Sequence, residues 1–168
     1  MLREEISQAL KSAMKAKKAQ CVSTLRLILA AIKDRDIAVR SGSDTDGISD
    51  DEIMKVLQTM VKQRQESIKM YEQGNRPELA EQEAEEIKII QEFLPDQLSS
   101  DEISDIVNKA IKELGAESLK DMGRMMAHLR ENYAGSMDFG KASAALKKSL
   151  GGAWRELLWG VEWVSHLM

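Results

Sequence analysis

Residues 92–102 have the sequence EFLPDQLSSDE, and this stretch decides how the fold is divided. Pro95 cannot continue a helix, because its ring removes a backbone N–H donor and clashes with the preceding turn. Shortly after it, Ser99 and Glu102 have the spacing of a capping box, which starts a new helix. One helix therefore ends at the proline and another begins just beyond it. We predict a linker at residues 95–98.

Upstream of this linker, the sequence predicts an N-terminal domain of four helices over residues 1–94. Apolar residues recur there at steps of three and four, which is the spacing of amphipathic helices. The expected helices cover residues 2–17, 20–39, 49–73 and 77–93. The polar segment 41–47 predicts a loop between the second and third helices. Ser49 and Glu52 predict a second capping box at the start of the third helix.

Downstream of the linker, residues 99–150 predict a smaller domain of three helices. After the helix that starts at Ser99, two shorter ones are expected over about 119–131 and 138–150. Only 4% of the residues are aromatic and only two are proline, whereas Ala, Leu, Met, Glu, Lys and Gln abound. This bias favours helices over strands. The predicted fold class is all-α, with four helices followed by three.

Residues 151–168 form an atypical tail that is rich in tryptophan. The first 150 residues contain no tryptophan, and then Trp154, Trp159 and Trp163 follow closely. The pair Gly151–Gly152 predicts a hinge before them. Two interpretations stay open, namely an appended or altered C-terminus and a helix that docks on a partner.

Composition excludes several classes of protein. The 168 residues are 43% hydrophobic, which is enough for a core, and no apolar run approaches the ~18 residues that a membrane span needs. Cys21 is the only cysteine, so a disulfide framework and a thiolate zinc site are excluded. Residues 1–18 do not resemble a secretory signal or a transit peptide. We expect a cytoplasmic protein that does not bind membranes.

Charge is distributed unevenly along the chain. Residues 119–150 carry six basic and three acidic side chains, whereas residues 74–98 carry two basic and seven acidic ones. The basic region predicts contacts with the phosphates of RNA, made to its backbone because aromatic residues that could stack on bases are few. The candidate nucleic-acid-binding residues are Lys120, Arg124, Lys141, Lys147 and Lys148. For the glutamates of the fourth helix, a solvated face is favoured over a metal or partner site.

A polar pair interrupts the apolar faces of the third and fourth helices. Arg64 lies between Met60 and Ile68, and Glu83 lies between Ala80 and Ile87. In an antiparallel pair of helices the two would be offset by about three residues, or about 5 Å. We predict a structural ion pair between Arg64 and Glu83 and favour it over a ligand site.

The sequence shows no constellation of catalytic residues. It contains no phosphate-binding glycine loop and no nucleophile elbow. His128 and His166 lie on different segments, and no acidic residue is placed to orient either one. We therefore predict no catalytic residue, no metal site and no cofactor in this chain alone.

Five segments resemble the YqeY family, in the family's order and over residues 1–150. They are STLRLILAAIK at 23–33, MVKQR at 60–64, EFLPDQL at 92–98, KDMGRMM at 120–126 and MDFGKAS at 137–143. Members usually stop near Leu150, so the tail departs from the pattern. The resemblance implies an all-helical protein in two parts, the second similar to the tail domain of GatB, a subunit of tRNA-dependent amidotransferase.

The family resemblance also implies a function. In the amidotransferase the tail helps to hold tRNA, while the catalytic centres lie elsewhere. YqeY-like domains are also joined to some glutaminyl-tRNA synthetases as tRNA-affinity modules. The resemblance implies a non-catalytic accessory protein with tRNA, an aminoacyl-tRNA synthetase or an amidotransferase as partner.

Two alternatives stay open. One is a protein-interaction module that uses the acidic fourth helix and the apolar tail. The other is a component of a carbon–nitrogen ligase with glutamine as amido-N-donor, which would need partner subunits.

Overall fold

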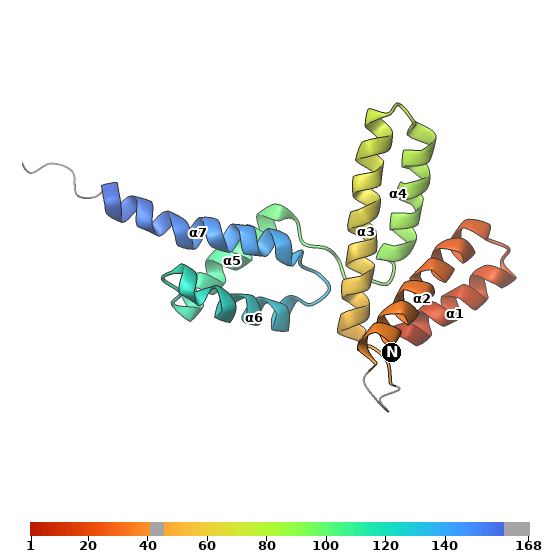
Figure 1. Ribbon diagram of the computed structural model, residues 1–168, viewed down its shortest axis with the longest axis horizontal. Helices are drawn as coiled ribbons and strands as arrows, with labels where there is room; N and C mark the ends of the chain where they lie inside the picture. The colour runs from red at the N-terminus through yellow and green to blue at the C-terminus, as the bar shows by residue number, and fades with distance from the viewer. Residues whose placement is uncertain (41–45, 160–168) are drawn as a thin grey trace, which may run out of the picture. The chain divides into compact units, whose positions relative to one another are not determined.

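The computed structural model describes residues 1–40 and 46–159, and over these residues it is built from helices alone (Figure 1). The elements are α1 (Leu2–Lys15), α2 (Ala19–Val39), α3 (Asp50–Gln73), α4 (Pro77–Gln91), α5 (Ser100–Leu114), the 3-10 turn η1 (Leu119–Asp121), α6 (Met122–Tyr133) and α7 (Phe139–Trp159). The prediction of an all-α fold with four helices followed by three is confirmed. The chain divides into two compact units, Met1–Asp96 and Gln97–Met168.

The first unit consists of two helical hairpins. Figure 1 shows α1 beside α2 and α3 beside α4, and α2 also packs on α4. Each helix contributes fully buried side chains to one core, among them Ile6, Ile28, Ile53, Leu57 and Ile90. Burial of such side chains is the main favourable contribution to folding, at about 1.5–3 kcal/mol each.

Local signals in the sequence account for the ends of these helices. Ser49 Oγ accepts the backbone N–H of Glu52 at 3.3 Å, but the Glu52 carboxylate turns to Lys55 instead of closing the predicted capping box. Gly74 ends α3 and Pro77 occupies the first turn of α4. Proline suits that position because its missing N–H would have no partner inside the helix.

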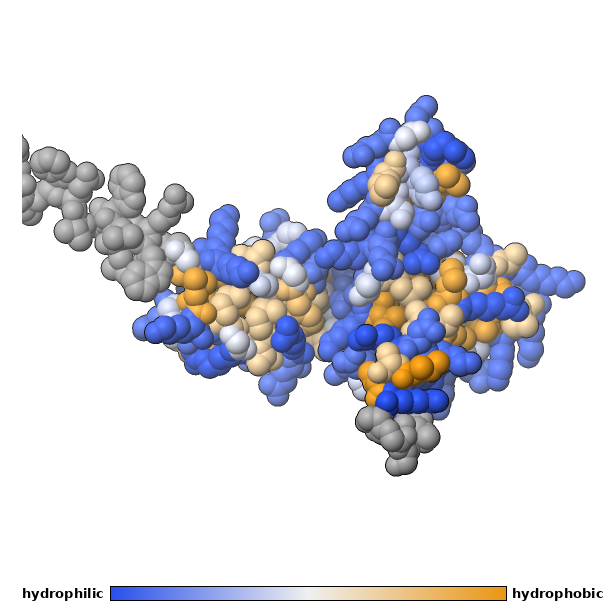
Figure 2. Space-filling view, viewed as in Figure 1, coloured by the Kyte–Doolittle hydropathy of each residue, from blue (hydrophilic) through white to orange (hydrophobic). Residues whose placement is uncertain are grey.

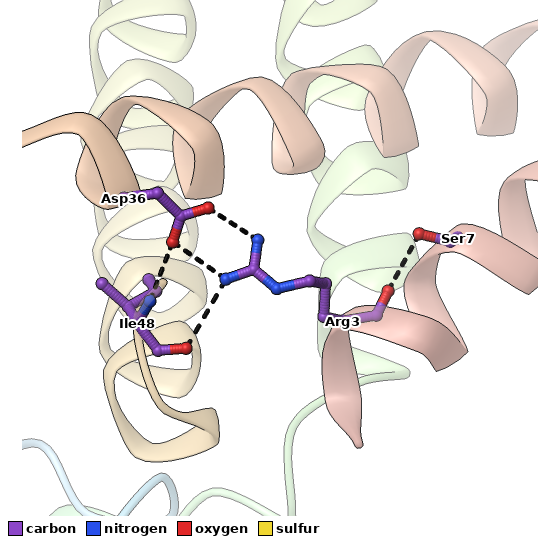
Figure 3. A network of polar contacts seen from close by, with 4 residues as sticks. All are labelled: Arg3, Ser7, Asp36 and Ile48. Carbon is purple, nitrogen blue, oxygen red and sulfur yellow. Dashed lines mark hydrogen bonds and ion pairs between the residues drawn. The ribbon is translucent and has the colours of Figure 1, made fainter. Parts of the chain in front are cut away.

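A polar network ties the loop before α3 to α1 and α2 (Figure 3). The Arg3 guanidinium donates to both carboxylate oxygens of Asp36, at 2.7 and 2.8 Å. Asp36 Oδ1 also accepts the backbone N–H of Ile48 at 2.8 Å. Gly47, with φ of +77°, fits against this ion pair, and a Cβ built there would lie 2.8 Å from both Arg3 Nη2 and Asp36 Oδ1. The network therefore fixes where the loop rejoins the bundle.

One buried hydroxyl in the first unit has no hydrogen-bond partner among the described residues. Thr24 is 1% exposed. Because such a hydroxyl loses its hydration without compensation, we expect Thr24→Val to raise the free energy of unfolding by about 1 kcal/mol. Urea denaturation would measure the change, with Thr59→Val as control, since Thr59 is exposed and donates to Lys55 O at 3.0 Å. Destabilisation by Thr24→Val alone would show that the hydroxyl is satisfied.

The second unit is a three-helix domain with its own core. Its fully buried residues include Val107, Met125, Leu129, Met137 and Leu146. At its start, Ser99 and Glu102 form the complete capping box that the sequence predicted.

The first residues of the second unit are anchored to the loop between α6 and α7. Gln97 Nε2 donates to Gly135 O at 2.6 Å, and Leu98 N donates to Ser136 O at 2.9 Å. The second half of the predicted linker is therefore held inside this unit.

The predicted hinge at Gly151–Gly152 is wrong. The helix α7 continues through both glycines to Trp159. Glycine costs about 1 kcal/mol relative to alanine in a helix but leaves the backbone hydrogen bonds intact, so two glycines do not end one. The rest of the tryptophan-rich tail, residues 160–168, lies outside the described residues.

Candidate functional site

The five cations predicted to bind nucleic acid are all exposed, on three elements of the second unit. Lys120 lies in η1 and Arg124 in α6, whereas Lys141, Lys147 and Lys148 lie on α7. Residues 142, 146 and 150 of α7 are buried in the core, so its opposite side faces solvent. Lys141 and Lys148 are two turns apart and share that side, with Lys147 next to them.

Arg124 is engaged in a structural role within the unit. It donates through Nη1 to the carbonyl oxygen of Leu114 at 3.0 Å and through Nη2 to Asp121 Oδ1 at 3.1 Å. The first contact satisfies a carbonyl at the C-terminal end of α5, where an intrahelical partner is lacking. Arg124 is therefore a weaker candidate for binding phosphate than the lysines are.

The Asp121 carboxylate organises the turn that leads into α6. Its Oδ2 accepts the backbone N–H groups of Glu117 at 3.0 Å and Ser118 at 3.2 Å. These hydrogen bonds, with a smaller contribution from Arg124, lower the pKa of Asp121. The carboxylate thus stays charged and keeps Arg124 in place.

The three lysines of α7 follow a well-defined helix start. Asp138 Oδ1 accepts the backbone N–H groups of Gly140 at 2.9 Å and Lys141 at 3.2 Å, which is an N-terminal cap. Among the described residues, no ion pair forms with Lys141, Lys147 or Lys148. Their ammonium groups are available to a ligand.

The polar cluster of the first unit contains Arg64 and Glu83 at ion-pair distance, as the sequence predicted, together with a second carboxylate, that of Glu86. Arg64 Nε donates to Glu86 Oε2 at 2.8 Å, while Glu83 Oε2 lies 4.0 Å away, and Arg64 Nη1 donates to Met60 O at 3.2 Å. The sequence alone did not identify Glu86 as a partner. Glu83 and Glu86 are three residues apart on α4, and both therefore face Arg64.

Burial and charge both act on the Glu83 carboxylate of this cluster. Burial raises the pKa of Glu83, the neighbouring Glu86 carboxylate raises it further, and Arg64 opposes both effects. The side chains of Arg64, Glu83 and Glu86 are only 13%, 23% and 16% exposed. Because Arg64 of α3 donates to Glu86 of α4, the cluster links these two helices.

The acidic face of α4 is partly neutralised by neighbouring cations. Glu78 lies 2.6 Å from Arg76 Nε, and Glu85 lies 2.9 Å from Lys88 Nζ. Among the described residues, no three His, Cys, Asp or Glu side chains come together in a way that could hold a metal ion. Within the same residues, every helix is too short or too polar to cross a membrane.

Comparison with known proteins connects this fold to one family. The family model described as Yqey-like protein matches residues 3–150. A relative from Clavispora lusitaniae, named altered inheritance of mitochondria protein 41, mitochondrial, is 30% identical over 88% of this chain and 84% of its own length. A protein of the same name from Meyerozyma guilliermondii is 37% identical over 53% of this chain and 44% of its own length.

Proposed function

The chain belongs to the YqeY-like family, and from that premise we propose that it is a non-catalytic accessory protein that binds tRNA. The proposed binding region is residues 119–150, and the lysines of α7 are its centre. The observation that carries the proposal is that Lys141, Lys147 and Lys148 are exposed on one helix, with no ion pair among the described residues. The similarity of this part to the GatB tail supports tRNA as the ligand.

The polar side chains of the described residues suit a protein that binds its ligand without catalysing a reaction. His128 of α6 is half-buried, and its Nδ1 lies 3.4 Å from the side-chain amide nitrogen of Asn132. A general base needs a partner that orients it and a reacting group within hydrogen-bond reach. The rival proposal, a subunit of a glutamine-dependent amidotransferase, would take every chemical step from partner subunits.

We expect binding to depend on salt, because each lysine that neutralises a phosphate releases a counterion. Replacing Lys141, Lys147 and Lys148 with glutamine should weaken tRNA binding. It should also reduce the slope of log affinity against log salt by about one unit for each phosphate that is no longer neutralised. Titrations of labelled tRNA at several salt concentrations would measure both quantities.

A matched control removes the same charge from the other unit. Lys55, Lys62 and Lys69 are exposed and seven residues apart on α3, so their replacement with glutamine changes the net charge equally. The control should bind tRNA like the unaltered protein. Equal weakening by both triple variants would refute the proposed region, because net charge would then account for the effect.

A further inference from the structure

A shallow, open groove with an apolar floor runs along α2, beside the C-terminal end of α1 and the turn that joins the two helices. It encloses about 810 Å³, and Met14, Val22, Leu27 and Ala30 are among its lining residues. Met14 and Leu27 are each 49% exposed, on the side of the hairpin that faces away from the core. Figure 2 shows hydrophobic residues at the surface over α1 and α2, bordered by hydrophilic ones. Large side chains left half-exposed in a hollow are typical of binding surfaces.

The segment that forms this groove carries positive charge and no negative charge. Residues 6–33 contain no aspartate or glutamate, although the whole chain has a net charge of −4. The cations of this segment are Lys11, Lys15, Lys17, Lys18, Arg26 and Lys33. None of them forms an ion pair among the described residues. Of the six, Lys17 and Arg26 line the groove itself.

Lys17 occupies a backbone conformation that is unfavourable for a lysine. It ends the turn after α1 with φ of +54°, a left-handed conformation that glycine adopts without steric cost. The only other described non-glycine residue with positive φ is Asn75, a residue type that tolerates it better, in the turn between α3 and α4. This conformation ends α1, because the Lys17 N–H donates to Met14 O at 3.2 Å and the Lys18 N–H donates to Ala13 O at 3.0 Å, and it leaves Lys17 at the edge of the groove.

We propose that this groove binds an amphipathic helix of a partner protein, with an apolar stripe on the floor and acidic residues against the surrounding cations. A helix suits the site because the lining residues of α2 run from Ala19 to Ala30, about 17 Å at 1.5 Å per residue, enough for about three turns of a helix beside them. RNA would gain nothing from the apolar floor, and the lining has no aromatic side chain for a base to stack on. A membrane requires a protruding apolar face, whereas these side chains line a hollow.

The test uses a labelled synthetic peptide with leucines at helical spacing and glutamates beside them. A peptide of identical composition with the leucine spacing scrambled serves as the control ligand. We expect the first peptide to bind the full chain, in fluorescence anisotropy, about tenfold or more tightly than the second. Leu27→Asp should weaken binding about tenfold or more, because it places a charge on the floor. Met70→Asp should leave binding unchanged, since Met70 is an exposed apolar residue on α3.

Two glycine variants separate binding from folding. Lys17→Gly and Asn75→Gly both relieve a left-handed residue, so both should raise the melting temperature. Lys17→Gly should nevertheless weaken peptide binding about two- to fivefold, as expected for the loss of one exposed charge, while Asn75→Gly should leave it unchanged. Equal binding of the two peptides, or binding insensitive to Leu27→Asp, would overturn the proposal.

Discussion

Gly47→Ala should lower the free energy of unfolding of the first unit by about 3 kcal/mol. A methyl group at this position would lie 2.8 Å from Arg3 Nη2 and from Asp36 Oδ1, and the backbone has φ of +77°. A left-handed alanine costs about 1–2 kcal/mol, and displacement of a charge-assisted hydrogen bond costs about 1.5–3 kcal/mol. The two effects act together because the ion pair must shift to admit the methyl group.

Gly115→Ala is the matched control for this prediction. Gly115 has φ of +62° and ends α5, but a Cβ there would meet no atom within 4 Å. Gly115→Ala should lower the free energy of unfolding by about 1–2 kcal/mol, which is the cost of a left-handed backbone for alanine alone. Chemical denaturation, followed for the full chain, would measure both variants. Equal losses of unfolding free energy in the two variants would show that the Arg3–Asp36 ion pair moves aside at little cost.

The same network predicts sensitivity to acid. Hydrogen bonds from Arg3 hold the pKa of Asp36 below its usual range, and the Ile48 backbone N–H adds to the effect. Because the pKa is lower in the folded chain, the stabilisation is fully present above the pKa of an unfolded aspartate, about 3.9. It is lost as the pH falls through the folded value. Asp36→Asn should therefore destabilise the protein at pH 7 and flatten the dependence of stability on pH in that window.

Arg64→Met should lower the free energy of unfolding by about 3 kcal/mol. The change keeps an unbranched stem that reaches about as far as Arg64 Nε, but it leaves the Glu83 and Glu86 carboxylates facing each other without a cation. Removing one partner of a buried ion pair costs about 3–5 kcal/mol, and the partial exposure of this cluster places the expected loss at the low end. Urea denaturation at pH 7 would measure it.

Two further variants in the cluster test the roles of its carboxylates. Replacing Glu86 with leucine together with Arg64→Met should recover much of the loss, because apolar residues can replace a buried ion pair.

Glu83→Gln should stabilise the protein. The pKa of Glu83 is raised by folding, so its ionised form is penalised only in the folded chain. That penalty is absent below the unfolded pKa of about 4.3 and develops as the pH rises through the folded value. A destabilising Glu83→Gln would show that Glu83, not Glu86, is the main partner of Arg64.

Several helix boundaries could be predicted from the sequence because helix caps are local. Pro77, Ser99 and Gly115 act on backbone groups within a few residues of themselves, so their effect can be predicted without tertiary structure. Gly151 shows the limit of such signals, since glycine weakens a helix without interrupting its hydrogen bonds.

The polar contacts that depend on tertiary packing were only partly predictable. Arg64 stood out because it interrupts an apolar face, but its closest partner depends on how α3 and α4 are rotated against each other. Arg124 was expected at the surface, and its bond to Leu114 depends on a turn that the spacing of residues does not specify. Gly47 carried no signal at all, because the ion pair beside it joins residues 33 positions apart.

A photoreactive residue at Ala144 tests the proposed tRNA site most directly. Ala144 is exposed on α7 between Lys141 and Lys148, so it would lie against the RNA backbone if these lysines bind phosphate. The same photoreactive residue at Thr59, exposed on α3, is the control. We predict that irradiation at low salt cross-links tRNA to position 144, and that the triple change of Lys141, Lys147 and Lys148 to glutamine abolishes the cross-link. Equal cross-linking at both positions, or none at position 144, would contradict the proposed site.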